Sequence, residues 1–354
     1  MISNARSAHT HPRRASGCFR RSAGFSLVEM MVAITVSSIL MVGVIQLLVS
    51  NKQAYRIQEG ASRLNETARF AGIDIAYRLR MADHWGGIAT SDVEQDAALP
   101  AVANDCTQAG WSVYGGVGVE GYEGQATSPM QTCIPDANYV AGTDVVVARY
   151  ADAQRVLTAQ ATSAPLDDDI YLRANVGQRA VIVQGDDITG LSADLHDPAD
   201  PDAAGVYNYP YRIAAYFVRP CSAPGADGIC NTADDVGDDI PTLVRLALAD
   251  TALVQEEVVE GVEQLQAVYG VNTDGDVAGT ADRYLTADNV SDWADVVSAR
   301  LSLVVRNPER DVAADDTDVY RMVGGFNYTP PASVRQFARQ LFHHVIQVRN
   351  RSRG

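Results

Sequence analysis

The chain has 354 residues and a formal net charge of −16, with 28 basic against 44 acidic side chains. This length is enough for one large domain, or for two small domains with an extension. Five of the basic residues lie within the first 24 residues, where there is no acidic residue, so the remainder is more acidic than the whole. Nucleic-acid binding needs a basic surface, so we expect this acidic domain to bind no nucleic acid directly.

An uncharged, mostly apolar run extends from Met30 to Asn51, between Glu29 and Lys52. As an α-helix it would be about 33 Å long, enough to cross a hydrocarbon core of about 30 Å. It is longer than the apolar region of a secretory signal peptide, and no small-x-small cleavage site follows it, so we expect it to be retained. The arginines before it predict a cytoplasmic N-terminus, with everything after Lys52 outside.

Cysteine usage agrees with an oxidising compartment. Cys18 precedes the apolar run, and Cys106, Cys133, Cys221 and Cys230 follow it. An even set beyond a membrane-targeting segment favours two disulfides, with four free thiols as the alternative. We expect local pairs, Cys106 with Cys133 and Cys221 with Cys230, although three connectivities are open. No CxxC spacing supports a zinc site.

Helical periodicity continues beyond the apolar run. Residues 51–85 contain no proline, and their apolar positions recur at helical spacing, which predicts one helix of about 55 residues. The expected stripe comprises Ile57, Leu64, Ile75 and Leu79, with Phe70 and Tyr77 beside it. Gly60 and Gly72 weaken this prediction locally, because glycine costs a helix about 1 kcal/mol. A membrane helix followed by a separate amphipathic helix is the alternative.

After Trp85, short runs rich in Val, Ile, Leu and Tyr are separated by Gly, Pro, Asp and Asn, which is typical of strands joined by loops. We expect strands at Asp144–Tyr150, Ala180–Gln184, Arg212–Arg219, Thr242–Ala249, Val262–Tyr269, Val296–Val305 and Leu341–Val348. Together with the helix they predict an α+β fold, in which a long helix packs on a mostly antiparallel sheet with large loops.

Motifs that would indicate an enzyme are weak. Gly116, Gly118 and Gly121 have G-x-G-x-x-G spacing, but a loop follows them where a dinucleotide site needs a helix. The sequence contains no H-E-x-x-H and no G-x-S-x-G, and the adjacent His343 and His344 would point to opposite faces of a strand. We therefore expect no enzymatic activity.

Acidic loops are the one indication of a bound ion. The segment "NTDGDVAGTAD" places Asp274, Asp276 and Asp282 near a glycine turn, loosely like an oxygen-rich calcium loop. It lacks the full EF-hand spacing, and solvated turns rich in Asp and Gly are the alternative. Calcium is the only candidate cofactor.

The segment "GFSLVEMMVAITVSSIL" closely resembles the class III signal of type IV prepilins and type II secretion pseudopilins. In that family a prepilin peptidase cuts after the glycine and methylates the new N-terminal residue, usually phenylalanine. The resemblance implies cleavage between Gly24 and Phe25 and N-methylation of Phe25. It also implies that Glu29 contacts the N-terminal amine of a neighbouring subunit, which would explain a costly carboxylate in lipid. A carboxylate that merely reaches the membrane interface is the alternative. The leader is longer than in close relatives.

The segments "TLVRLAL", "EEVVEGVEQLQAVYGVNTDGD", "WADVVSARLSLVVRN" and "QLFHHVIQVRNR" resemble the PilW family of minor pilins. This resemblance implies a structural protein for the initiation and assembly of type IV pili, in a tip or priming complex. Its expected partners are other minor pilins, the major pilin, the prepilin peptidase and the inner membrane. The alternatives are a type II secretion minor pseudopilin of the J type and a pilus-tip adhesin with a calcium-organised loop.

The same resemblance implies a type IV pilin-like domain organisation. Residues 1–24 would be the leader, 25–50 the transmembrane half of the helix and 51–85 its amphipathic half. Residues 86–354 would be a periplasmic or extracellular α+β domain. The protein would cross the inner membrane once, with its N-terminus in the cytoplasm, and later reach the pilus at the cell surface.

Overall fold

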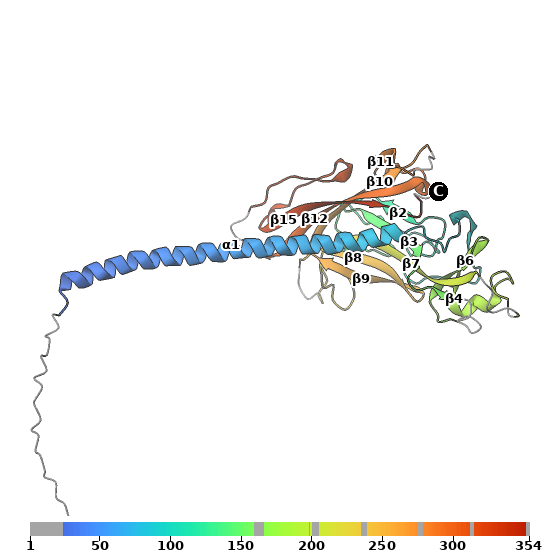
Figure 1. Ribbon diagram of the computed structural model, residues 1–354, viewed down its shortest axis with the longest axis horizontal. Helices are drawn as coiled ribbons and strands as arrows, with labels where there is room; N and C mark the ends of the chain where they lie inside the picture. Colours follow the sequence, from blue (N-terminus) through green and yellow to red (C-terminus); the bar gives the residue numbers. More distant parts are fainter. Residues whose placement is uncertain are drawn as a thin grey trace, which may run out of the picture. The chain divides into compact units, whose positions relative to one another are not determined.

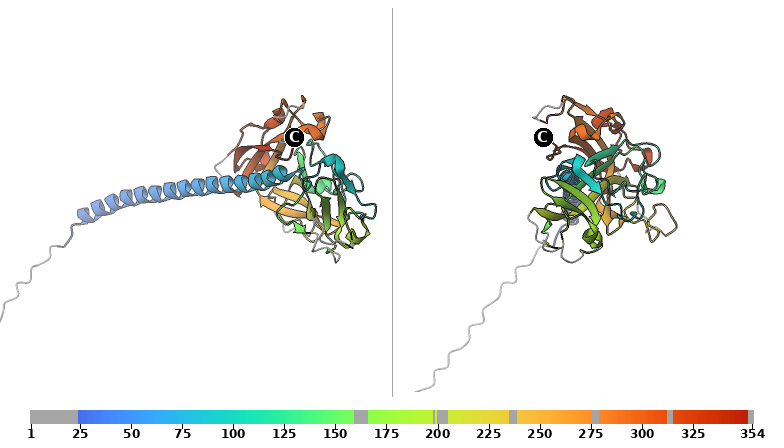
Figure 2. Two further views of the ribbon diagram at one scale, coloured as in Figure 1. Left: turned by 45° about the vertical axis from the view of Figure 1, so that its right-hand side comes forward. Right: turned by 90° about the vertical axis from the view of Figure 1, so that its right-hand side faces the viewer.

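The computed structural model describes residues 24–158, 166–197, 199, 205–234, 239–274, 279–311 and 315–351. By its internal contacts the chain divides into two compact units, Met1–Gln58 and Glu59–Gly354. One helix, α1 (Leu27–Met81), has residues in both and contains 55 residues (Figures 1 and 2). The continuous helix predicted from the sequence is thus confirmed. It ends before Asp83, whose φ of 65° is left-handed and cannot continue a right-handed helix.

The larger sheet has nine strands over the described residues. The order of strands along its main path is β1 (Val93–Gln95), β6 (Arg179–Gln184), β5 (Ile170–Asn175), β7 (Val206–Arg219), β3 (Val145–Ala151) and β2 (Val119–Tyr122). Two further strands, β4 (Leu157–Thr158) and β8 (Thr242–Ala249), also pair with β7. The ninth strand, β9 (Ala252–Glu260), pairs with β8. Only β1 and β6 pair in parallel among these described strands. Because β7 has 14 residues, it can pair with β5 at one end and with β8 at the other.

Two smaller antiparallel sheets complete the described strands. The four-stranded sheet has the order β11 (Arg283–Leu285), β10 (Val262–Val271), β12 (Val296–Arg310) and β15 (Phe337–Gln347), and the hairpin pairs β13 (Tyr320–Arg321) with β14 (Asn327–Tyr328). Short 3-10 helices are η1 (Thr90–Asp92), η2 (Asp136–Asn138), η4 (Gly185–Gly190), η5 (Ala287–Asn289), η6 (Trp293–Asp295), η7 (Val323–Gly325) and η8 (Ala332–Val334). The α+β fold with a mostly antiparallel sheet is confirmed.

The buried residues form two main layers on opposite faces of the larger sheet. On β3, Val146 and Ala148 pack with α1 and the four-stranded sheet, whereas Val145 and Val147 face loops that precede and follow β2. This alternation follows from the two-residue period of a strand and explains why every residue of β3 is buried. Figure 1 shows β10, β12 and β15 on one side of the end of α1 and β8 and β9 on the other.

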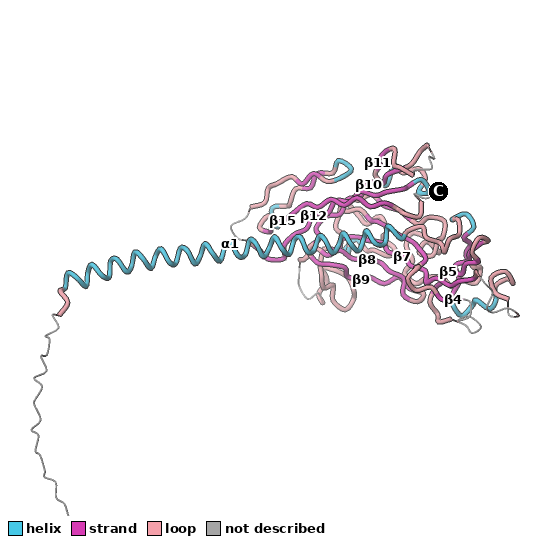
Figure 3. The backbone as a smooth tube through the Cα atoms, viewed as in Figure 1, coloured by secondary structure: helices cyan, strands magenta, loops and turns pink. Residues whose placement is uncertain are grey.

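The predicted strands were correct in type but incomplete. Each of the seven overlaps an observed strand, and β8 has the predicted bounds. The sequence did not indicate β5 or β9. Much of the chain between α1 and β3 is loop (Figure 3). The predicted stripe is correct for Leu64, Ile75 and Leu79 but wrong for Ile57, which is 61% exposed because burial on the helix begins only at Gly60. Phe70, expected beside the stripe, is 55% exposed, because alanines and Ile75 occupy the buried face of the helix.

Candidate functional site

The predicted cleavage site immediately precedes α1. Gly24, Phe25 and Ser26 lie outside regular structure, and Leu27 is the first helical residue. A Cβ atom on Gly24 would meet no atom within 4 Å, and Phe25 is 85% exposed. Among the described residues, Gly24 and Phe25 are therefore exposed, as a bond that a protease cuts must be.

Ser26 and Glu29 form a reciprocal cap on the first turn of α1. Oε2 of Glu29 accepts a hydrogen bond from the backbone N–H of Ser26 at 2.9 Å, and Oγ of Ser26 accepts one from the N–H of Val28 at 3.3 Å. The S-x-x-E spacing is typical of this capping box, which satisfies amides that a helix start leaves unpaired. The carboxylate also lies at the positive end of the helix dipole. The sequence analysis did not assign a role to Ser26, although the spacing between Ser26 and Glu29 is the signal for a capping box.

One oxygen of Glu29 remains open. Among the described residues, Oε1 accepts no hydrogen bond, whereas Oε2 holds the start of the helix. A carboxylate has about four acceptor positions on its two oxygens, so it can cap its own helix and still accept from a second donor. A cationic donor such as an ammonium group would bind such an anion strongly in lipid.

The helix beyond Glu29 presents apolar side chains on all sides. Every residue from Leu27 to Gln58 is exposed. Oγ1 of Thr35 donates to the carbonyl of Val32 at 2.8 Å, and Oγ of Ser38 donates to that of Ile34 at 2.7 Å, so both hydroxyls are satisfied within the helix. Lipid requires such internal pairing of polar groups. Among the described residues, α1 is the helix that is long and apolar enough to cross a membrane.

Small residues bring the second half of α1 close to the four-stranded sheet. A Cβ atom on Gly72 would lie 2.2 Å from Cε1 of His344 in β15, and one on Gly60 would lie 2.7 Å from Nδ2 of Asn307 in β12. The two glycines that weakened the helix prediction thus allow a close approach between helix and sheet. Burial lowers the pKa of His344, which favours its neutral form against the helix.

Polar contacts fix the same part of α1 against the larger sheet. Oδ2 of Asp74 accepts hydrogen bonds from the hydroxyl of Tyr216 at 2.5 Å and from Nη1 of Arg245 at 2.8 Å. Arg245 also pairs with Glu256 of β9 at 2.6 Å. Because these directional contacts join α1 to β7, β8 and β9, they define one position of the helix along the sheet.

The last residues of the chain close the C-terminal end of α1. Nδ2 of Asn350 donates to the carbonyls of Met81 and Ala82, at 3.2 and 2.9 Å. Nε of Arg351 pairs with Oδ2 of Asp83 at 2.6 Å, and both side chains are only 7% exposed. These contacts satisfy carbonyls that a helix end leaves unpaired. They give a structural reason for the segment "QVRNR", whose role could not be read from the sequence.

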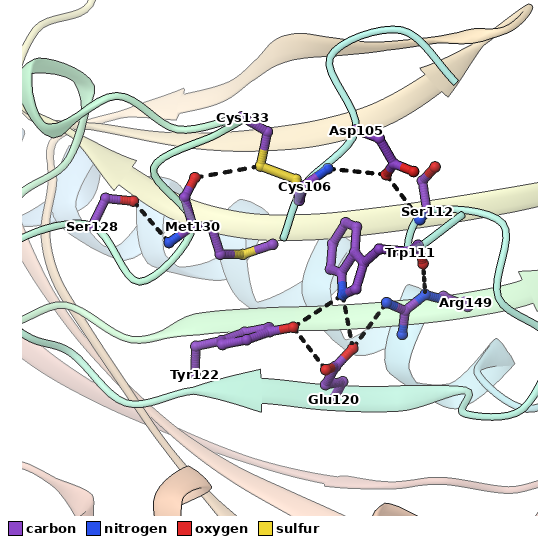
Figure 4. Close-up of a disulfide and its surroundings, with 10 residues drawn as sticks. All are labelled: Asp105, Cys106, Trp111, Ser112, Glu120, Tyr122, Ser128, Met130, Cys133 and Arg149. Carbon is purple, nitrogen blue, oxygen red and sulfur yellow. Dashed lines mark hydrogen bonds and ion pairs between the residues drawn. A yellow bond between two sulfur atoms is a disulfide. The ribbon is translucent and has the colours of Figure 1, made fainter. Parts of the chain in front are cut away.

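Both disulfides join cysteines that are neighbours in the sequence, as we expected. Cys106 pairs with Cys133 across a separation of 27 residues, and Cys221 pairs with Cys230 across 9. Figure 4 shows the first of them beside Met130 and the loop that leads to Trp111. Closing loops of this size stabilises a fold by roughly 2–4 kcal/mol.

A buried carboxylate joins the two larger sheets. Oδ1 of Asp144 accepts from the N–H of Gly124 at 2.8 Å, and Oδ2 accepts from the N–H of Ala267 in β10 at 2.7 Å. Burial, reinforced by the nearby Glu123 and Asp288 carboxylates, raises the pKa of Asp144 to about 7, and the two backbone hydrogen bonds oppose this shift.

The predicted calcium ligands are only partly described. Asp274 and Asp282 lie between β10 and β11, whereas Asp276 lies outside the described residues. Oδ2 of Asp282 accepts from the backbone N–H and from Oγ1 of Thr273, at 2.6 and 2.8 Å, and these bonds lower its pKa. Within the described ranges, no cluster of three or more His, Cys, Asp or Glu could hold a metal ion. Calcium binding by this loop stays a prediction.

The G-x-G-x-x-G glycines are explained by packing. A Cβ atom on Gly118 would lie 2.3 Å from the backbone nitrogen of Asp83, and one on Gly121 would lie 2.1 Å from the hydroxyl oxygen of Tyr269. His343 hydrogen-bonds Ser302 Oγ at 2.8 Å, while His344 faces α1, so the two histidines lie on opposite sides of β15 as a strand requires.

An exposed apolar helix with a glutamate in its first turn, followed by a mostly antiparallel α+β domain, is the architecture of a pilin-like protein. Comparison with known families agrees. The prokaryotic N-terminal methylation motif matches residues 19–45, and the type IV pilus-assembly protein W family, PilW, matches residues 226–350. No curated protein and no solved structure matches the chain. The predicted resemblance is confirmed over these residues, and it supports a membrane-anchored, pilus-related protein.

Proposed function

We propose that this chain is a minor pilin that takes part in the initiation and assembly of type IV pili, within a tip or priming complex. The observation that carries the proposal is the methylation motif at the head of an exposed apolar helix whose first turn contains Glu29. The PilW match over residues 226–350 favours pilus assembly over a type II secretion pseudopilin of the J type. Families of this kind are structural, so the proposed role needs no catalytic residue.

Processing and topology follow from the same segment. The prepilin peptidase would cut between Gly24 and Phe25, remove residues 1–24 and methylate Phe25. The arginines of the leader favour a cytoplasmic N-terminus, and the two disulfides favour a periplasmic domain. Once assembled with other minor pilins and the major pilin, the domain would reach the cell surface.

In this proposal, Glu29 orients subunits during assembly. Its Oε2 caps the helix to which it belongs, and Oε1 would accept the N-terminal amine of a neighbouring subunit. Apolar helix contacts tolerate sliding, whereas a charged pair in lipid has few alternative partners and so fixes the axial register. The proposal therefore assigns the carboxylate charge to assembly and the capping bond to the helix start.

Three variants separate these two roles. Glu29→Gln retains an oxygen that can accept from Ser26 N–H but removes the charge, whereas Glu29→Val removes both. Ser26→Ala keeps the charge and loses the hydroxyl half of the cap. In a deletion strain complemented with each variant, membrane level, leader cleavage and co-purification with other pilins would be measured.

We expect normal membrane levels and cleavage for all three variants, because removing a carboxylate from lipid does not hinder insertion. Co-purification and piliation should be lost in Glu29→Gln and Glu29→Val and retained in Ser26→Ala. Full piliation by Glu29→Gln would contradict the role of the charge. If piliation were lost in Glu29→Val alone, the loss would be assigned to the helix cap.

A further inference from the structure

The globular domain contains a cavity of about 210 Å³ beside the loop that the Cys106–Cys133 disulfide fastens. Three aromatic side chains line it: Trp111, Tyr114 and Trp293. Binding sites for drug-sized ligands measure about 300–1,000 Å³, so this cavity suits a single ring rather than an extended molecule. The site is separate from the N-terminal segment and from every residue that the proposed assembly role uses.

Several side chains that line the cavity have polar groups without a protein partner. Among the described residues, the Gln108 amide, the Tyr114 hydroxyl and Trp293 Nε1 make no hydrogen bond, whereas the Gln95 amide donates to the carbonyl of Val113 at 2.8 Å. The lining thus combines hydrogen-bond donors and acceptors with aromatic rings. This combination suits a ligand that has hydroxyl groups around its rim and an apolar C–H face.

An ion pair neutralises the charged wall of the cavity. Nη2 of Arg149 lies 2.8 Å from Oε2 of Glu120, and the Arg149 side chain is fully buried. The guanidinium lies 4.5 Å from the centre of the Trp111 ring, whose Nε1 donates to Tyr122 Oη at 2.9 Å (Figure 4). Since the two charges compensate each other within an acidic protein, the cavity favours a neutral ligand over an anionic one.

The rim of the cavity is held in place before any ligand arrives. The Asp105 carboxylate accepts from the backbone N–H groups of Cys106 and Ser112, at 2.9 and 3.0 Å (Figure 4), and from that of Gly110 at 2.7 Å. Thr107 has a φ of 48°, a left-handed conformation that is costly for a β-branched residue. A rim that is fastened by a disulfide and a carboxylate loses little entropy on binding.

We propose that this cavity binds one neutral sugar residue, with its C–H face on the aromatic side chains and its hydroxyl groups on Gln108, Tyr114 and Trp293. The ring would be either a free monosaccharide or the end of a glycan. Such a site would add surface recognition to the assembly role proposed above, and it does not depend on that role.

The test uses the full chain in a detergent without a sugar headgroup. Saturation-transfer NMR would be recorded with glucose, galactose, mannose and N-acetylglucosamine, with their methyl glycosides, and with sialic acid as the anionic arm. If saturation transfer to a methyl glycoside is at least equal to that of the free sugar, the natural ligand is the end of a glycan. Two of the three tryptophans line the cavity, so fluorescence provides a second readout.

We expect millimolar binding of at least one neutral sugar, weakened about tenfold by Tyr114→Ala and by Trp293→Phe. Tyr114 is 50% exposed, so its loss should leave folding intact, and Trp293→Phe removes the N–H while retaining a ring against Tyr269. Phe70→Ala, at a 55% exposed aromatic outside the cavity, is the matched control and should bind as wild type does. Binding of no neutral sugar, binding of sialic acid alone, or unchanged binding by Trp293→Phe would overturn the proposal.

Discussion

Replacing Gly72 by alanine tests how α1 is held on the domain. Helix propensity alone predicts that Gly72→Ala stabilises the protein by about 1 kcal/mol. In the structure, however, the added methyl would lie 2.2 Å from Cε1 and 2.4 Å from Nε2 of His344. Forcing extra atoms into a packed contact costs about 1–3 kcal/mol. We therefore expect a net loss of about 1 kcal/mol, and a melting temperature lower by about 2–4 °C.

The assay is thermal and urea unfolding of the full chain in detergent, followed by tryptophan fluorescence. Gly60→Ala is the matched control, because its methyl would meet only the side-chain amide of Asn307, whose end can swing away. We expect Gly60→Ala to be close to neutral. Adding His344→Ala to Gly72→Ala should recover about 1 kcal/mol relative to the sum of the single variants. A Gly72→Ala protein that melts above wild type would refute the close contact.

Three further predictions concern charged groups. Arg351→Met leaves Asp83 buried without its cation and should lower the free energy of unfolding by about 3 kcal/mol. The double variant with Asp83→Asn and Arg351→Met should lose less stability, and equal losses in the two proteins would contradict a buried ion pair. Because the folded-state pKa of Asp144 is raised to about 7, its stabilising contribution is full below about pH 4 and is lost as the pH rises through 7. The melting temperature should fall between about pH 4 and pH 7, and the fall should be smaller in Asp144→Asn. Identical melting temperature–pH profiles for the two proteins would contradict the raised pKa of Asp144. Calcium at millimolar concentration should raise the melting temperature more than magnesium does, and an unchanged curve would leave Asp282 as an ordinary turn residue.

The sequence was most informative where periodicity is strong and local. The long helix was predictable from its apolar spacing, and β8 from a run of apolar residues bounded by Pro241 and Asp250. The strand β5 was not indicated by the sequence, and it contains Arg173, which is only 2% exposed. Its charge is accommodated by the Leu195 carbonyl and the Asn208 side chain, which are distant in sequence.

Contacts between distant segments explain the other omissions. Asn350 caps a helix that ends 269 residues earlier, at Met81, and no local pattern could indicate that pairing. The cavity combines residues from β1, the loop before β2 and η6, so it exists only in the folded domain. In the N-terminal segment, by contrast, Ser26 and Glu29 are only three residues apart, so the capping box is visible in local spacing even though its Ser26 half was overlooked.

Intact-mass analysis of the protein from the membrane fraction tests the central claim most directly. We expect a chain that begins at Phe25, carries one methyl group on its N-terminal amine and retains the whole of α1. Tandem fragmentation would place the methyl group on Phe25. A chain that still carries Gly24, or one that begins beyond Lys52, would contradict the assignment of this protein as a processed pilin.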